Sequence, residues 1–136
     1  MYMLDTNVII YAMRHPKSGV NDILQEHIGK DVFISAITFA ELEYGIQKSA
    51  KPEKNRLAVQ RILANIPVLD FDINAAKHFG DIFSRLEQEK RRIGDRDTLI
   101  AAHARSLGYT IVTHNTREFQ RVENLVVEDW LEQFLS

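Results

Sequence analysis

The sequence contains no cysteine, so disulfide bonds and thiolate metal sites are both excluded. It has no apolar run near the roughly 18 residues that a membrane-spanning helix requires. Its first residues carry an acid at position 5 and no basic stretch ahead of a long apolar segment, so we expect no signal peptide. These absences predict a cytoplasmic protein in a reducing compartment, without membrane association.

A large excess of positive charge is also missing. The chain has 17 basic and 19 acidic residues and a formal charge of -2, which argues against indiscriminate nucleic-acid binding through net charge. A local basic rim is compatible with this balance, because Lys90, Arg91, Arg92 and Arg96 immediately precede Asp97. The same run equally suits a solvated helix end and loop, and the charges alone leave both interpretations open.

The composition is that of an ordinary globular domain. The 136 residues are 45% hydrophobic and 26% charged, which suits one domain around one sizeable core. No internal repeat, low-complexity segment or linker interrupts the pattern. We therefore expect a single domain over residues 1–136.

Short apolar runs alternate with amphipathic segments along the whole chain. The runs predict strands over residues 2–5, 32–35, 67–69, 109–112 and 125–127. Apolar residues at helical spacing predict helices over residues 22–28, 38–47, 74–88 and 95–107, others that begin near residues 8 and 51, and short ones over residues 116–120 and 129–134. This alternation predicts an α/β fold with a parallel sheet and helices on both faces.

Acidic or amide side chains stand near the edges of these buried segments. Asp5 closes the first strand, Glu41 follows the second, Asp97 begins a helix and Asn115 follows the fourth strand. In an open α/β sheet the strand ends converge on one crevice. Carboxylates gathered there repel one another unless a cation lies between them, so the pattern predicts a metal site.

Each of these residues also has an ordinary structural interpretation. Asp5 suits the N-cap of the following helix, and Asp97 suits a first helical turn, where the macrodipole favours negative charge. Glu41 alone would be a surface acid, and Asn115 a turn residue or helix cap. We interpret Asp95 as the cap of its helix, which leaves Asp97 to face the crevice.

Two histidines lie near this set. His103 follows Asp97 by six residues within the same predicted helix, and we expect it to be packed rather than catalytic. His114 directly precedes Asn115 and could carry a proton, although a lone histidine at a strand end is more often structural.

Several segments carry a family resemblance that covers essentially the full chain in the correct order. They resemble the motifs of PIN-domain ribonucleases, particularly the VapC-type toxins of bacterial toxin–antitoxin pairs. The segments are MLDTN at residues 3–7, SAITFAELEYG at 35–45, IGDRDTLIAAHA at 93–104, VTHNTREF at 112–119 and EDW at 128–130.

The resemblance implies a PIN-like three-layer α/β/α sandwich with a central, mainly parallel sheet of about five strands. It implies that Asp5, Glu41 and Asp97 bind a divalent metal, and that Asn115 is the fourth catalytic position. Carboxylate oxygens are hard ligands, which favours Mg²⁺ or Mn²⁺. The family often has aspartate at the fourth position, so Asn115 removes one negative charge from the usual set.

The implied activity is that of a toxin endoribonuclease, which hydrolyses RNA phosphodiester bonds, with tRNA the expected substrate, and so inhibits translation. The implied partners are a cognate VapB-type antitoxin that blocks the acidic crevice, a second copy in a homodimer, and a higher assembly of both. The expected RNA-contacting residues are Thr6, Lys90, Arg91, Arg92, Arg96 and Arg117.

Three alternative classes of protein also begin with, or share, an acid at the end of the first strand. A haloacid-dehalogenase-like phosphatase needs a second aspartate two residues after Asp5, where this chain has Asn7, and no matching later lysine motif is present. A receiver domain needs an adjacent acidic pair near the start. The third alternative is a degenerate PIN domain that binds RNA or protein without cutting, and the three retained acids argue against it.

Overall fold

A central sheet of five strands organises the molecule, in a computed structural model that describes residues 1–135. The strand order is β3-β2-β1-β4-β5, and every neighbouring pair is parallel. The strands are β1 (Tyr2–Leu4), β2 (Val32–Ser35), β3 (Val68–Leu69), β4 (Thr110–Val112) and β5 (Val127–Glu128).

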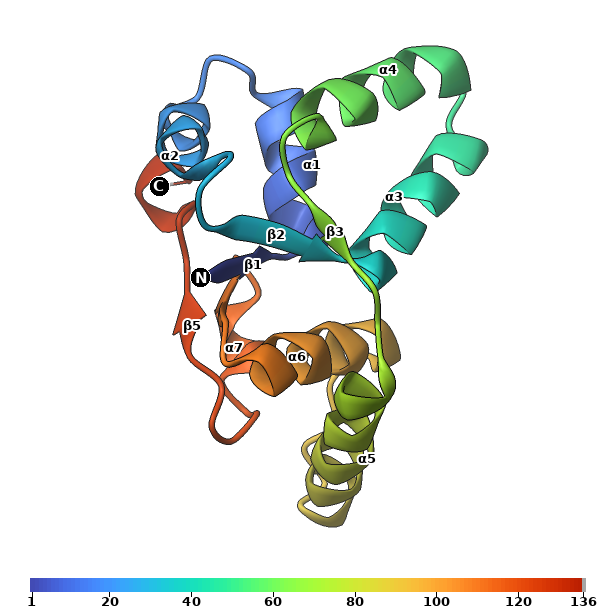
Figure 1. Cartoon of the computed structure of the whole chain (residues 1–136), viewed down its shortest axis with the longest axis vertical. Helices are drawn as coiled ribbons and strands as arrows, with labels where there is room; N and C mark the ends of the chain where they lie inside the picture. Colours follow the sequence, from blue (N-terminus) through green and yellow to red (C-terminus); the bar gives the residue numbers. More distant parts are fainter. Residues whose placement is uncertain (136) are drawn as a thin grey trace.

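Helices cover both faces of this sheet. They are α1 (Thr6–Arg14), α2 (Gly19–His27), α3 (Ala36–Lys48), α4 (Pro52–Leu63), α5 (Ile73–Gln88), α6 (Asp95–Leu107) and α7 (Thr116–Phe119), followed by a 3₁₀ turn at Glu132–Phe134. Figure 1 shows α1 to α4 on one side of β1 and β2, and α5 to α7 on the other. The predicted three-layer α/β/α sandwich is confirmed.

The buried core consists of two clusters, one on each face of the sheet. Strand β1 contributes to both, because successive strand side chains point to opposite faces. Met3 packs with Ile100, Ile111 and other residues under α5 and α6. Leu4 packs with the apolar residues of α1 to α4 on the other face. Both side chains are fully buried, and each such burial contributes about 1.5–3 kcal/mol.

Helix α6 lies close to the sheet because its inward face is made of small residues. Ala101, Ala102 and Ala104 are fully buried. The helix ends at Gly108, which adopts the left-handed conformation (φ 69°) that favours glycine. This close packing holds the first turn of α6, with Asp97, near the carboxyl end of β1.

The structure corrects several expected boundaries. The fifth strand begins at Val127 rather than at residue 125, and the predicted helix over residues 129–134 is only the 3₁₀ turn. The N-cap of α6 is Gly94 rather than Asp95, which is exposed and pairs with Arg92 instead. Gly94 makes no side-chain cap hydrogen bond, and glycine is one of the residues that helix N-caps accept.

Among residues 1–135, no helix has both the length and the apolar character needed to cross a membrane.

Candidate active site

The topology places a crevice at the carboxyl end of β1. Strands β2 and β3 extend the sheet on one side of β1, and β4 and β5 extend it on the other. The connection after β1 leads to β2 on one side, and the connection after β4 leads to β5 on the other, so the direction reverses between β1 and β4 and leaves an open crevice there. Asp5 directly follows β1, while α3, which carries Glu41, begins where β2 ends.

Asp5 is held rigidly at the floor of this crevice and is only 4% exposed. Its Oδ1 accepts from the Thr6 backbone N–H at 2.7 Å, and its Oδ2 accepts from Thr113 Oγ1 at 2.8 Å. Burial, followed by repulsion from Asp97 and Glu41, raises the pKa of Asp5 to about 6 against the opposing effect of these hydrogen bonds. Asp5 is thus both the N-cap of α1 and a destabilised anion facing two other acids.

Asp97 lies on the opposite wall and is half-buried. Burial and repulsion from Glu41 raise its pKa, while a hydrogen bond from Asn115 acts in the other direction. That bond runs from Asn115 Nδ2 to Asp97 Oδ2 at 3.1 Å, and Asn115 N–H donates to Thr113 Oγ1 at 2.9 Å. The amide at the fourth position therefore stabilises the neighbouring carboxylate that an aspartate would repel.

Glu41 completes the group from the β2 side. Its Oε1 accepts from Thr6 Oγ1 at 2.6 Å, and its Oε2 lies 3.6 Å from Arg96 Nε. Thr6 begins α1 and Arg96 lies in the first turn of α6, so Glu41 is tied to both neighbouring elements. The structure thus brings together the four predicted site residues, and also Thr6 and Arg96 from the predicted RNA-contacting set.

The donor set fits a hard divalent cation. Burial first, and repulsion among the three carboxylates second, raise the pKa values of Asp5 and Asp97, and a bound cation would offset both effects. Within residues 1–135, no three acidic or histidine side chains stand close enough to enclose a metal ion. Mg²⁺ does not require such a cage, because it keeps several waters and takes only one or two carboxylates directly.

The remaining predicted RNA-contacting residues are exposed, and none of them lines the cavity beside Asp97. An open cavity of about 430 Å³ is lined by Glu41, Gly94, Asp95, Arg96 and Asp97. Lys90 and Arg91 are exposed in the loop before α6, and Arg117 is exposed on α7 just after Asn115. Arg92 lies over the Phe83 ring at 4.8 Å.

Two polar contacts were not predicted from the sequence. Thr113 is fully buried and bonds Asp5, and its signal was a hydroxyl residue at a strand end two positions before Asn115. Ser35 Oγ lies 2.7 Å from His103 Nδ1, so the predicted packing of His103 includes a specific polar partner. Local patterning gives no indication of that partner.

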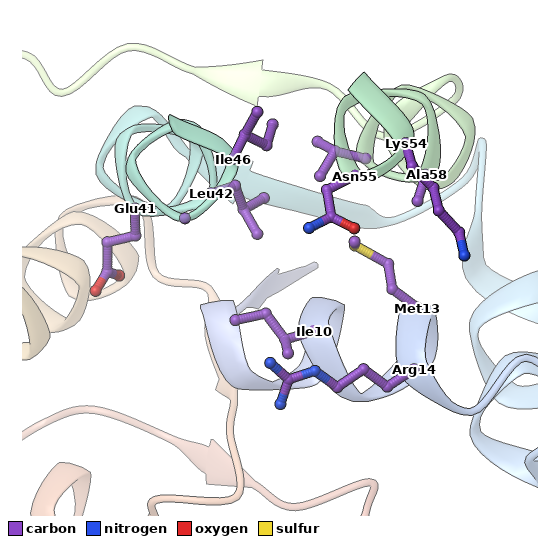
Figure 2. A pocket seen from close by; sticks show the side chains of 11 residues that line it. Ile10, Met13, Arg14, Glu41, Leu42, Ile46, Lys54, Asn55 and Ala58 are labelled. Atoms are coloured by element: carbon purple, nitrogen blue, oxygen red, sulfur yellow. The ribbon is translucent and has the colours of Figure 1, made fainter. Parts of the chain in front are cut away.

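A second concavity begins beside Glu41. This groove has a volume of about 270 Å³ and runs between α1, α3 and α4. Figure 2 shows Ile10, Met13 and Leu42 in its apolar part, with Glu41 at one edge and Arg14 and Lys54 at its rim. Its mainly apolar lining suits a protein segment better than a phosphate backbone, whereas the open cavity beside Asp97 has the polar character of a reaction site.

The chain is similar to proteins of one family over nearly its full length. The sequence model described as "PIN domain" matches residues 2–125. The tRNA(fMet)-specific endonuclease VapC of Shigella flexneri is 43% identical over 129 residues, which cover 95% of this chain and 97% of the relative. The Ribonuclease VapC of Haemophilus influenzae is 41% identical over 130 residues, which cover 96% and 98%.

Solved structures agree with these sequence relatives. The DNA-bound VapBC of Salmonella typhimurium superposes with a TM-score of 0.90 at 37% identity, and the match covers 95% of this chain and 97% of that one. VapBC2 of Rickettsia felis, bound to a DNA fragment from its promoter, superposes with a TM-score of 0.89 at 36% identity, and the match covers 95% of this chain and 98% of that one.

Proposed function

The chain belongs to the PIN-domain family, and from this membership we propose that it is a VapC-type toxin endoribonuclease, one PIN domain over residues 1–136. The relatives' names favour a nuclease over the non-catalytic alternative. The observation that carries the proposal is the meeting of Asp5, Glu41 and Asp97 in one crevice, with the pKa of Asp5 raised by burial and by the two other acids. RNA is the substrate class, and tRNA is the expected RNA.

We assign a divalent cation, Mg²⁺ or Mn²⁺, to Asp5, Glu41 and Asp97, since hard oxygen donors match these ions. When bound, such an ion stabilises charge on the attacked phosphate and lowers the pKa of water. Thr113 and the Thr6 N–H fix the Asp5 carboxylate, and Thr6 Oγ1 fixes Glu41.

Arg96 connects the acids with the substrate. Its guanidinium is exposed and lies 3.6 Å from Glu41, so the ion pair is weak and solvent-screened. An RNA phosphate that enters the open cavity can therefore replace Glu41 as the partner of Arg96 with little loss of free energy. Arg117, Lys90, Arg91 and Arg92 would contact the flanking phosphates, and the unstacked bases of an RNA loop would approach most easily.

The groove between α1, α3 and α4 is the proposed site of a VapB-type antitoxin. An antitoxin segment with apolar side chains would bury Ile10, Met13 and Leu42 and end over Glu41. A basic antitoxin residue there would compete with the cation for the acids. We also propose a homodimer, with a higher assembly when antitoxin is bound.

The deciding experiment is incubation of the purified chain with total tRNA in Mg²⁺, in Mn²⁺ and in EDTA. Cleavage is expected only with the metals, and Asp97→Asn should abolish it while the far-ultraviolet circular dichroism stays unchanged. Asp22→Asn is the matched control, because Asp22 is an exposed aspartate in the first turn of α2 and does not line the cavity beside Asp97. Undiminished cleavage in EDTA, or full activity of Asp97→Asn, contradicts the proposal.

The antitoxin assignment has a separate test. The chain expressed alone should stop bacterial growth, the Asp97→Asn chain should not, and co-expression of the small protein encoded beside it should restore growth. Sequencing the RNA ends that appear after expression identifies the bond that is cut. A chain that is harmless when expressed alone contradicts the toxin assignment.

A further inference from the structure

A histidine–aspartate pair stands at the β4–β5 side of the crevice, opposite Glu41. His114 follows β4 and Asp129 follows β5, at the level where Val112 pairs with Glu128. His114 Nδ1 lies 2.8 Å from Asp129 Oδ2. The pair is adjacent to Asn115, which bonds Asp97, so it borders the acidic group on the side away from Arg96.

Asp129 is an anchored carboxylate. Its side chain is 11% exposed, and its Oδ1 accepts from the backbone N–H groups of Leu131 at 2.8 Å and Glu132 at 3.1 Å. These contacts start the 3₁₀ turn that ends the described chain. The carboxylate therefore offers His114 a fixed acceptor rather than a mobile surface charge.

His114 in turn is held at both its backbone and its ring. Its backbone N–H donates to Asn7 Oδ1 at 3.4 Å, which joins it to the first turn of α1. Because a carboxylate can only accept, the Nδ1 atom facing Asp129 must carry a hydrogen. The side chain is 48% exposed, which leaves the second ring nitrogen, Nε2, open to solvent at the crevice edge.

The hydrogen on Nδ1 determines which groups Nε2 can bind. In the neutral ring with hydrogen on Nδ1, Nε2 carries a lone pair and accepts a hydrogen bond. A phosphodiester has no hydrogen to donate, whereas each ribose of RNA carries a 2′-hydroxyl that does. An RNA strand that crossed the acids from Arg96 toward β5 would bring its sugars to this nitrogen.

We propose that His114, positioned by Asp129, binds RNA by accepting a hydrogen bond from one ribose 2′-hydroxyl beside the cut. This inference rests on the proposed ribonuclease function and adds to it a residue that distinguishes RNA from DNA at one nucleotide. Asp129 acts as a positioning residue and does not touch the substrate.

The test uses synthetic RNA hairpins that span the bond cut by the wild-type chain, each with one ribose near the cut replaced by deoxyribose. In the wild-type chain one replacement should lower kcat/KM by about 3- to 10-fold, the size of one net hydrogen bond. His114→Phe keeps a planar ring and removes both nitrogens, so it should lower kcat/KM on the all-ribose hairpin by a similar factor. In that variant the same deoxyribose replacement should cost nothing further.

A binding measurement separates recognition from chemistry. In the inactive Asp97→Asn background, fluorescence anisotropy should show that His114→Phe raises Kd for the all-ribose hairpin and leaves Kd for the deoxyribose hairpin unchanged. His15→Phe is the control, since His15 is exposed at the end of α1 and its ring packs on Tyr11.

The possible failures are distinguishable. If the wild-type chain cuts no hairpin or cellular RNA, the proposed function itself fails. If it cuts and His114→Phe retains wild-type kcat/KM, only this inference is overturned. If His114→Phe loses activity and the deoxyribose replacement still lowers its kcat/KM by the full wild-type factor, the hydroxyl assignment is overturned. His114 and the 2′-hydroxyl then act independently.

Discussion

Ser35 Oγ and His103 Nδ1 lie 2.7 Å apart in the core and join the two helices that carry the acids. Ser35 ends β2 and caps α3, the helix of Glu41, by accepting from the Ile37 N–H at 3.0 Å. His103 belongs to α6, the helix of Asp97, and is almost fully buried. Burial lowers the pKa of His103, so the neutral ring is the form that pairs with the serine.

Ser35→Ala should therefore destabilise the protein. The variant removes the cap of α3 and leaves a buried ring nitrogen unpaired, and together these cost about 2–3 kcal/mol. Urea unfolding measures the difference. Ser84→Ala is the control, because the Ser84 hydroxyl is exposed and bonds only the backbone of its own helix, at Asp81 O. A Ser35→Ala midpoint equal to that of Ser84→Ala would show that the link contributes little.

Asp5→Asn should stabilise the metal-free protein at neutral pH while it abolishes cleavage. The pKa of Asp5 rises from 3.8 to about 6 on folding. Below pH 3.8 the group is neutral in both states. Between pH 3.8 and 6 the unfolded chain ionises first, so stability falls, and above pH 6 the loss is constant at roughly 3 kcal/mol at most. Asparagine removes this penalty and can still accept from the Thr6 N–H.

Urea unfolding in EDTA checks the Asp5 prediction. The variant should exceed wild type in free energy of unfolding at pH 7, and the difference should shrink toward pH 3.5. Asp22→Asn provides an exposed aspartate for comparison. A variant less stable than wild type at pH 7 would mean that the hydrogen bond from Thr113 outweighs burial and repulsion.

Asn115→Asp should tighten divalent metal binding and destabilise the metal-free fold. The substitution replaces the donor to Asp97 Oδ2 with a like charge, which adds to the repulsion already raising the pKa of Asp97. A cation relieves this repulsion, so titration calorimetry with Mn²⁺ should give a Kd roughly 10-fold lower, or about 1.4 kcal/mol. An unchanged Kd would place residue 115 outside the electrostatic reach of the ion.

Gly45→Leu should block antitoxin binding and leave RNA cleavage largely intact. Gly45 lines the groove between α1, α3 and α4, and a Cβ there would meet nothing within 4 Å, so a larger side chain can fold and fill the space. Growth arrest should then persist during antitoxin co-expression, and pull-down should recover less complex. Gly80→Leu is the matched control, since Gly80 is also helical and open but lies on α5. Full neutralisation of the Gly45 variant contradicts the assigned groove.

The sequence predicted the layered fold because its signals are local. Apolar runs and helical periodicity reveal strands and helices, and their alternation limits the sheet to a parallel one. Strand-end placement also identified Asp5, Glu41, Asp97 and Asn115 as one group, although their roles as ligands stay a prediction. Local signals failed at Asp95, where Gly94 caps the helix, and at the chain end, where Asp129 accepts N–H groups in a turn instead of starting a helix.

The residue types at the crevice were thus determined by the sequence, and their chemical states only by the tertiary structure. Asp5 acquires a pKa near 6 because folding buries it, bonds it to Thr113 and places it beside Asp97 and Glu41. The orientation of the His114 ring is fixed because the ring pairs with Asp129, which follows the neighbouring strand β5. Such contacts join residues far apart in the chain, so they depend on packing that no local pattern encodes.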